Sequence, residues 1–525
     1  MSDFGIEACE PANAATVADT SLVVIAPTYG RGEKNGGFKP PIDLLGPIHD
    51  QWNKLIHPLL QRMDQHLDCR LVATLGRTIL SIIEHRHRNS GLLLSELGCF
   101  ICDPGHAPAG TKRLSNLLRS PGWKAEEIGD HLWRQARQTH AECRAQGQDM
   151  LMLWDESVIE KPESAESEGL SPVRSSKSKR LTRIKPGFYR PPQRPIFVPG
   201  IHWLALLLIG RQGPPSVAAM RWWGTRMPKA KKEVKAETPV IGLSDPQDHT
   251  EMALVPSLAL AKMDSDEDDS PEVPLWLRSR REVQLELLAH CCRAFGREII
   301  HVFDRGYAGG PWLRAMHDNC ARFILRWPKG YHLEDEWGRK LPAWRFLLGK
   351  RSWEARYIRD TARRQERRVG VAAVRVYSAN YGSGIAPLWL LASRQGPGKE
   401  PWYILTNEPI ENSEQAWQVV MAYARRWQIE ACFRFNKSEL ALESPRLWTW
   451  ERRHKLLMIA TLAYSLLLGL LDLPLAWREN LFKNWGHRTG KRNQLALIPL
   501  YRLRAALAAL LFTCHLYARF YESSG

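Results

Sequence analysis

Two short apolar runs, each followed at once by an aspartate, most strongly constrain how this chain can fold. The run from Met150 to Trp154 leads into Asp155, and the segment REIIHVF leads into Asp304. Apolar runs of this length predict buried strands. A single aspartate at a strand end is more often a turn or cap residue. Two of them can fix carboxylates at the rim of a sheet, where a hard cation is shared.

A third acid, Glu430, belongs to the segment YARRWQIEACFRFNK, residues 423–437. Because neither proline nor glycine occurs between Ser413 and Lys437, we predict a single helix there. A helical step of about 100° per residue places four side chains on one narrow stripe: Tyr423, Arg426, Glu430 and Lys437. Charge on a helix is often no more than a solvated face. One carboxylate inside a row of phosphate-binding side chains is instead the layout expected of a glutamate that holds a metal beside a polyanion.

The composition favours a negatively charged partner. The 525 residues carry 73 lysines and arginines against 56 acids, for a formal net charge of +17. This balance favours binding to nucleic acid or another polyanion, and the length allows roughly two to four domains. The first residues lack the positive region of a signal peptide, and the apolar segment 456–471 is short for a membrane span. We therefore expect a soluble, intracellular protein that binds no membrane.

The ten cysteines are scattered along the chain, which indicates reduced thiols in a cytoplasmic protein. Cys99 and Cys102, with His106 close behind, have the spacing of half a zinc site. No second pair with matching spacing occurs in the sequence. Ordinary buried thiols are therefore the favoured interpretation.

Composition also separates the flanks of the chain from its centre. Residues 1–46 are rich in glycine, alanine and proline and predict a flexible arm. Residues 47–147 have a helical pattern with Lys112 and Arg113 on an exposed segment, which predicts a DNA-binding domain. A helical scaffold with a basic surface would give the same pattern. Residues 471–525 predict a helical, basic C-terminal region.

Strand patterns and polar insertions alternate in the centre. Residues 161–195 and 226–274 are polar and predict flexible insertions. Residues 337–406 alternate or run apolar at strand length, which predicts a β-rich stretch directly before the glutamate helix.

Together these features resemble the DDE transposases of the insertion-sequence-four family. Asp155, Asp304 and Glu430 correspond to the three acids of that family. The spacing Y-x2-R-x3-E-x6-K is matched in full by the four residues of the stripe. FDRGY around the second aspartate and SEL at 438–440 fit as well. The resemblance covers roughly residues 148–470.

The resemblance implies an α/β, RNase H-like fold: a mixed five-stranded sheet flanked by helices, with helical N- and C-terminal regions. The catalytic domain would comprise residues 148–332 and 405–470. A β-rich insertion domain, residues 333–404, would precede the glutamate helix. In the family an aromatic side chain of the insertion can stack on a flipped base, and the candidates here are Trp337, Trp344, Trp353, Trp389 and Trp402.

The activity that the resemblance implies is cut-and-paste transposition of double-stranded DNA. Asp155, Asp304 and Glu430 would bind two Mg²⁺ ions, for which Mn²⁺ can substitute, and the ends of the transposon would be cleaved. In the family the freed 3′-hydroxyl usually forms a hairpin before strand transfer into target DNA. The phosphates near the cleaved end would be held by Tyr423, Arg426 and Lys437. Arg305 and Arg425 are further candidates, and an ordinary surface role would suit each of them equally well. The expected state is a homodimer that pairs two terminal inverted repeats in a prokaryotic-type cytoplasm, associated with the nucleoid.

Several alternatives stay open. Asp155 is followed by Glu156 and Ser157 instead of the family's usual small residue and threonine, so Asp149 and Glu160 are alternative first acids. The same fold would suit a domesticated DNA-binding protein without transposition, or a structure-selective nuclease that cuts without strand transfer. A membrane-surface protein built on the apolar segment 456–471 is a third, weaker alternative.

Overall fold

The computed structural model describes residues 42–514, apart from residues 86–90, 103, 165, 176–193, 211–212, 225–278, 361–364, 395, 397–399 and 487–499. The predicted insertion 226–274 therefore lies outside the described residues, as does most of the predicted arm. Residues 42–46 of that arm are described, and they form the first turn of a helix. The arm as predicted from composition is thus too long at its C-terminal end.

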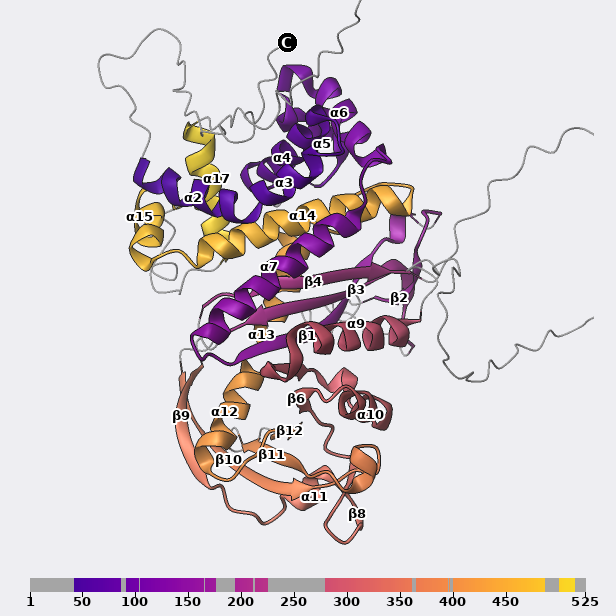
Figure 1. Ribbon diagram of the computed structural model, residues 1–525, viewed down its shortest axis with the longest axis vertical. Coiled ribbons are helices and arrows are strands. Elements are labelled where there is room, and N and C mark those ends of the chain that lie inside the picture. The colour runs from indigo at the N-terminus through magenta and orange to yellow at the C-terminus, as the bar shows by residue number, and fades with distance from the viewer. Residues whose placement is uncertain are drawn as a thin grey trace, which may run out of the picture.

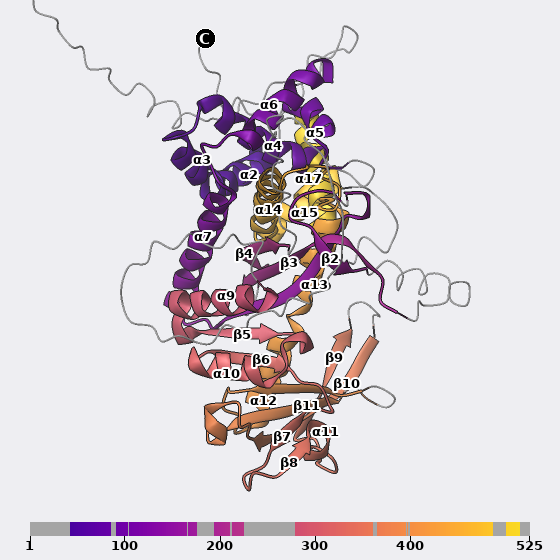
Figure 2. The same ribbon diagram turned by 90° about the vertical axis from the view of Figure 1, so that its right-hand side faces the viewer.

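The N-terminal part of the described chain is helical. Its elements are α2 (Ile42–Leu55), α3 (His57–Asp64), α4 (Cys69–Glu84), α5 (Leu94–Ile101), α6 (Ala107–Arg119) and α7 (Ala125–Ala145). The C-terminal helices are α14 (Trp450–Leu471), α15 (Leu475–Trp485) and α17 (Leu500–Cys514). Figures 1 and 2 show the two groups gathered at one end of the molecule, where α4 packs against α14 and α17.

Helix α14 contains the apolar segment that the sequence predicts as a buried helix. Among the described residues it is the helix that is long and apolar enough to cross a membrane, but 83% of its most apolar stretch is buried inside the protein. Its neighbours include α2, α4, α6, α7 and α17. These contacts account for the apolar composition without a membrane, so the prediction of a buried helix is confirmed.

The centre of the molecule is a mixed sheet. Its strands are β1 (Met150–Glu160), β3 (Phe197–Ile209), β4 (Ser216–Trp223), β5 (Ile299–Phe303) and β6 (Arg322–Arg326). They lie in the order β4-β3-β1-β5-β6, with β1 parallel to β5, β5 parallel to β6, and antiparallel pairing elsewhere. This is the mixed five-stranded arrangement expected from the sequence.

The sheet continues beyond β6, which the sequence does not predict. Strand β12 (Trp402–Thr406) pairs with β6, and β11 (Leu388–Arg394), β10 (Gln365–Val376) and β9 (Glu354–Asp360) follow in that order. The β-rich stretch is therefore an extension of the central sheet, as the lower half of Figure 1 shows. The complete sheet has ten strands. Only β7 (His332–Glu334) and β8 (Lys340–Pro342) form a separate pair among the described strands, beside the short helix α11 (Ala343–Phe346).

Alternating side chains give the sheet two buried faces. Met152 and Trp154 of β1 pack with α9 (Arg280–Phe295) and α10 (Gly310–Asp318). Leu151 and Leu153 belong to the other core, which includes α13 (Trp427–Ser438) and α14. Because side chains along a strand alternate between faces, each residue's number fixes which helices it meets.

The predicted insertion 161–195 is partly ordered, contrary to the expectation of a flexible loop. It contains a 3₁₀ turn, η2 (Pro162–Ser164), and a strand, β2 (Ser171–Arg174), that pairs with β3. The buried Arg453 of α14 donates to the carbonyl oxygen of Glu168 over 2.8 Å. A hydrogen bond from the core therefore holds part of a segment whose composition alone indicates a loop.

The helix predicted over residues 413–437 is two helices. Helix α12 (Ser413–Ala424) ends before Arg425, and α13 begins at Trp427. Between them the backbone bonds tighten to three-residue steps, from Arg426 to Tyr423 (3.0 Å) and from Gln428 to Arg425 (3.0 Å). Such i to i−3 bonds are the 3₁₀ pattern, and they occur here without proline or glycine.

Candidate active site

The two strand-associated aspartates lie side by side. Trp154 pairs with Phe303 at the end of the parallel ladder, so Asp155 and Asp304 are the next residue on each strand. Asp155 shares its face of the sheet with Leu151 and Leu153, and Asp304 follows the alternation of Ile300 and Val302. Both carboxylates therefore belong to the face that packs against α13. The prediction that Asp155 ends its strand is wrong, because β1 continues to Glu160 along β3.

Glu430 lies in the first turn of α13 and is joined to Asp155 through Arg426. The Nη1 atom of Arg426 is 2.9 Å from Oδ2 of Asp155. Its Nη2 atom is 2.5 Å from Oε1 of Glu430. The Arg426 side chain is 7% exposed, whereas those of Asp155 and Glu430 are 15% and 33% exposed. One buried guanidinium thus bridges an acid from the sheet and an acid from the helix.

Burial controls the electrostatics of this cluster. Removal from water raises the pKa of Asp155 to about 7, although the Arg426 guanidinium and the Glu156 backbone N–H oppose the rise. The carboxylates of Asp304 and Glu430 add to it by repulsion. Burial alone would lower the pKa of Arg426, but the negative groups around this side chain raise it above its ordinary value. The cluster therefore strongly favours a positive charge among the acids.

Tyr423 and Lys437 flank this bridge. Tyr423 is buried, its ring centroid 5.4 Å from that of Trp402 and 5.8 Å from the guanidinium carbon of Arg426. The Nζ atom of Lys437 donates to Oγ of Ser157 over 2.8 Å. Ser157 lies two residues beyond Asp155 on the same face of β1. The four residues of the predicted stripe therefore follow one side of the sheet despite the break between the helices.

Arg326 lies beside the acidic cluster, at a position that is not predicted from the sequence. Phe303 pairs with Leu325, so Arg326 lies beside Asp304 just as Asp304 lies beside Asp155. Its guanidinium carbon is 5.7 Å from the centroid of the Trp402 ring, and burial lowers the pKa of its side chain. Its Nη2 donates to the carbonyl oxygen of Pro401 over 3.2 Å, while the buried Nη1 has no hydrogen-bond partner among the described residues. The sequence feature that could have indicated Arg326 is the segment RFILR, a strand that ends at this residue.

The other predicted contacts lie in different surroundings. Arg305 follows Asp304 in η5 (Arg305–Tyr307), is exposed, and its backbone N–H donates to the Asp304 carboxylate. Arg425 donates to the carbonyl oxygens of Gly210 (2.7 Å) and Gly213 (2.9 Å), so it ties the β3–β4 loop to the helices. Lys112 and Arg113 are exposed on α6, in the helical end of the molecule and away from β1 and α13 (Figures 1 and 2).

Neither alternative first acid shares the position of Asp155. Asp149 precedes the first residue of β1, at the opposite end of the parallel ladder. Glu160 is buried, and because it is an odd number of residues from Asp155 along β1, its side chain lies on the opposite face of the sheet. It accepts a hydrogen bond from Ser175 Oγ over 3.0 Å. Glu156 also faces away from α13, and it pairs with Arg280 of α9 over 2.6 Å. Asp155 is the acid of this segment that lies beside Asp304.

Five tryptophans were candidates for stacking on a base. Trp337, Trp344 and Trp353 are exposed in the extension of the sheet. Trp402, on β12, is the candidate whose ring lies against Tyr423 and under Arg326. The geometry therefore relates Trp402 to the site more closely than it relates the exposed three.

Metal-binding geometry is not preformed. Among the described residues, no three histidine, cysteine or acidic side chains lie close enough together to hold a metal ion. This includes Cys99, Cys102 and His106, and the Cys99 thiol donates to the Ser95 carbonyl over 3.1 Å. At the acidic cluster, the guanidinium of Arg426 takes the position between two of the carboxylates.

Comparison with known families agrees with this geometry. Residues 278–466 match a family model described as a transposase DDE domain. The matched segment contains Asp304, Glu430 and the other members of the stripe, and it begins after Asp155. The match supports an RNase H-like fold and a transposase- or nuclease-type function, and DDE transposase domains generally use divalent metal ions. No curated protein matches the sequence.

Proposed function

We propose that Asp155, Asp304 and Glu430 are the catalytic acids of a DNA transposase. The observation that carries this proposal is the position of Arg426, whose guanidinium is bonded to Asp155 and to Glu430. A protein that buries acids from a strand and a helix must neutralise them, and here an arginine does so. Asp304 completes the set, because the strand register brings it beside Asp155.

The donor set fits a hard divalent cation. Three carboxylates offer the oxygen ligands that Mg²⁺ prefers, and Mn²⁺ accepts the same ligands. The guanidinium of Arg426 stands in for such a cation, so the acids become available when this side chain turns away. When bound, two Mg²⁺ ions supply an activated water and stabilise the leaving oxygen of a phosphodiester.

The basic side chains around the acids would hold the DNA strand. Arg426, once released from the carboxylates, can make a bidentate contact with a phosphate. Lys437 lies further along β1, beside Ser157, and can contact a second phosphate. Arg326 and the exposed Arg305 lie on the far side of Asp304 and complete a basic border. Tyr423 is buried, so we assign it to positioning Arg426 and Trp402.

The reaction proposed is cut-and-paste transposition of the insertion-sequence-four type. The support is the Y-R-E-K spacing together with the contacts of Arg426 to Asp155 and Glu430 and of Lys437 to Ser157. One strand is nicked at a transposon end, the free 3′-hydroxyl attacks the opposite strand to form a hairpin, and the reopened end is transferred to target DNA. Two ends must be paired, so the active form is proposed to be a homodimer on two terminal inverted repeats.

The domain organisation is part of the same proposal. Residues 47–147 form a DNA-binding region, residues 148–332 and 405–470 the catalytic domain, and residues 333–404 the insertion. The continuous sheet means that the insertion would be held rigidly against the catalytic strands through the pairing of β12 with β6. The place of action is proposed to be the prokaryotic cytoplasm, on the nucleoid.

The test is cleavage of labelled duplex DNA that carries the inverted repeats flanking the protein's own reading frame. Purified wild type with Mg²⁺ is expected to produce a nick and then a hairpin on a denaturing gel. Asp155→Asn, Asp304→Asn and Glu430→Gln are expected to bind the duplex but yield neither product. Asp149→Asn, at the other end of β1, is the matched control and should cut like wild type.

Each outcome is informative. Nicks without hairpins in wild type would favour a structure-selective nuclease over the transposase. Binding without any cleavage, in the presence of Mg²⁺ or Mn²⁺, would favour a domesticated DNA-binding protein. Cleavage that persists in Asp155→Asn but is lost in Asp149→Asn would reassign the first acid.

A further inference from the structure

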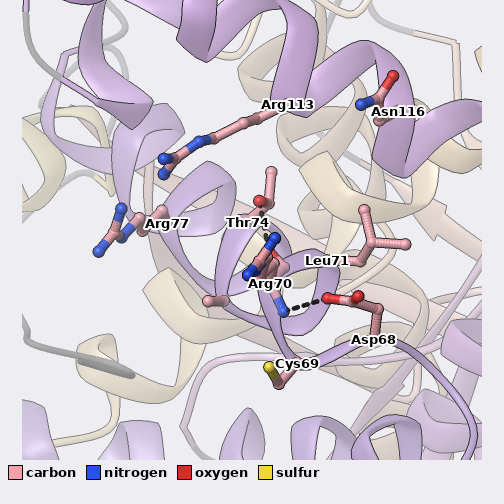
Figure 3. Close-up of a pocket in the computed structure, with 9 residues that line it drawn as sticks. Asp68, Cys69, Arg70, Leu71, Thr74, Arg77, Arg113 and Asn116 are labelled. Atoms are coloured by element: carbon pink, nitrogen blue, oxygen red, sulfur yellow. Dashed lines mark hydrogen bonds between the residues drawn. The ribbon is translucent and has the colours of Figure 1, made fainter. Parts of the chain in front are cut away.

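The helical N-terminal region contains a basic cavity that the catalytic proposal does not use. It encloses about 560 Å³ between α4 and α6. Three arginines line it: Arg70 and Arg77 from α4, and Arg113 from α6. Figure 3 shows the side chain of Arg113 extending from one helix toward Arg77 and Arg70 on the other.

The positions of these arginines follow from helical spacing. Arg70 and Arg77 are seven residues apart on α4, so they lie on one face about two turns from each other. Leu75 and Ile79 hold the opposite face of α4 in the core, and Leu114 and Leu117 of α6 are buried in the same core. The cavity is therefore built on two helices whose apolar faces are fixed, with the charged faces turned outward.

Close packing against α5 fixes the position of α6, the helix that carries Arg113. Gly110 lies one turn before Arg113, and an added Cβ at Gly110 would collide with the carbonyl group of Gly98 on α5. Only a residue without a side chain permits α5 and α6 to approach this closely. Arg113 is thus presented from a helix that has little freedom to shift.

The charge of the cavity is not balanced by the residues that the structure describes. Across the described part of the chain, no ion pair or side-chain hydrogen bond engages the guanidinium groups of Arg70, Arg77 and Arg113. The one acid in the lining is Asp68, whose carboxylate caps α4 by accepting the Arg70 backbone N–H over 2.7 Å. Three cations facing one carboxylate repel one another, and an anion would relieve that repulsion.

From this geometry we infer that the cavity between α4 and α6 binds phosphodiester groups of the DNA backbone. Guanidinium groups match phosphate oxygens in a bidentate manner, and Asn116 adds an amide at the rim. Arg70 and Arg113 are exposed, so the sugar–phosphate backbone of a DNA duplex can reach them. Exposed Lys112 and Arg119 lie on the same helix and extend the positive surface. Contacts of this kind position a duplex without reading its sequence.

This inference rests on the proposed function, in that the bound polyanion is taken to be DNA. The test measures duplex affinity by fluorescence anisotropy, with the full-length chain and without metal, so that cleavage plays no part. Two labelled duplexes of equal length are compared: one with the inverted repeat and one of scrambled sequence. The variants are Arg70→Gln, Arg77→Gln and Arg113→Gln. Arg137→Gln, an exposed arginine on α7 outside the cavity, is the matched control.

Each cavity variant is expected to weaken binding of both duplexes by a similar factor, roughly 3- to 10-fold at moderate salt. The slope of log affinity against log salt should fall by about one for each phosphate that the variant no longer neutralises. Arg113→Lys should retain part of the affinity, because a point charge remains without the bidentate geometry. Thermal melting should match wild type, because these side chains carry no partners within the described protein.

Four results would overturn the inference. An equal loss in Arg137→Gln would reduce the effect to overall charge. A loss confined to the inverted-repeat duplex would indicate base reading instead of phosphate contact. If all three variants bind DNA as tightly as wild type does, the cavity does not contact DNA. That result would leave the transposase proposal intact. Stabilisation of wild type by inorganic phosphate at fixed ionic strength, absent in the variants and without change in their DNA affinity, would assign the cavity to a free anion.

Discussion

Asp155 and Asp304 are adjacent across two parallel strands, because Trp154 pairs with Phe303 and each aspartate is the next residue. Neither the spacing nor the composition of the sequence reveals this register. It has one consequence for every experiment on the site: the two carboxylates are held by paired backbones, whereas Glu430 is held by a helix and an arginine. Changes on α13 can therefore move Glu430 while the aspartates stay in place.

Arg425 and Arg426 are neighbours in sequence, but we expect Arg425 to stabilise the fold and Arg426 to act in cleavage. Arg425→Gln removes two bonds to loop carbonyls and should lower the free energy of unfolding by about 1–3 kcal/mol. It should leave single-turnover cleavage close to wild type. Arg426→Gln should instead reduce cleavage by roughly 100-fold or more, because it removes the side chain that we propose to bind phosphate near the reacting strand. Urea unfolding and single-turnover kinetics on both variants separate the two effects, and the reverse pattern would contradict the assignment.

Arg426 should also compete with metal. Its guanidinium is bonded to two of the proposed ligands, so a neutral replacement frees them. We expect Arg426→Gln to bind Mn²⁺ about tenfold more tightly than wild type, even though it cuts DNA poorly. Electron paramagnetic resonance of free Mn²⁺ measures the affinity directly. Weaker Mn²⁺ binding in Arg426→Gln would show that the guanidinium organises the acids and does not replace the cation.

His301 should make the fold sensitive to acid. It is fully buried beneath the site, its Nδ1 accepts from Trp154 Nε1 over 3.0 Å, and burial lowers its pKa to about 3. The unfolded chain takes up a proton near its ordinary pKa of about 6.5, so this contribution to stability is complete above that pH and is lost as the pH falls. At pH 5 the loss should be about 2 kcal/mol.

The measurement is urea unfolding at pH 7.5 and pH 5 for wild type and His301→Gln. The variant should lose less stability than wild type over this interval, by about 2 kcal/mol. His131 and His454, whose pKa values burial lowers to about 4, remain in both proteins and contribute equally. An identical pH dependence in the two proteins would mean that His301 is not held neutral.

Arg453 should be essential for stability and not for chemistry. It is buried in α14 and donates to the carbonyl oxygens of Glu168, Leu447 and Trp448. Arg453→Met removes the donor from the carbonyls of Glu168 and Leu447, whereas the Trp448 carbonyl still accepts the Glu168 backbone N–H, and the change should cost about 3 kcal/mol. Arg452→Met, one residue earlier and partly exposed, is the control and should change stability by less than about 0.5 kcal/mol. Equal unfolding midpoints for the two variants would refute the role given to Arg453.

Much of the fold could be predicted because it depends on local pattern. The apolar runs before Asp155 and Asp304 are strands, and the apolar segment 456–471 lies within helix α14. The continuous ten-stranded sheet could not be predicted, because the pairing of β6 with β12 joins segments far apart in the chain. Likewise, the extension of β1 past Asp155 depends on β3 at its other edge.

The site shows the same division. Asp304, Glu430 and the stripe residues could be selected by type and spacing. The helix break at Arg425 could not, because no glycine or proline marks it and the tightened backbone bonds accompany packing of Tyr423 against Trp402. Arg326 was overlooked because an arginine that ends a strand is common, and only the register with Asp304 gives it meaning. The assignment of all these residues to DNA and metal stays a prediction.

The most direct measurement is anomalous diffraction from crystals of the full chain with an inverted-repeat duplex and Mn²⁺. We predict Mn²⁺ peaks among Asp155, Asp304 and Glu430, with the Arg426 guanidinium turned from the acids toward a phosphate. An ordered protein–DNA complex that lacks Mn²⁺ at these residues, with Arg426 still bridging Asp155 and Glu430, would contradict the proposed site.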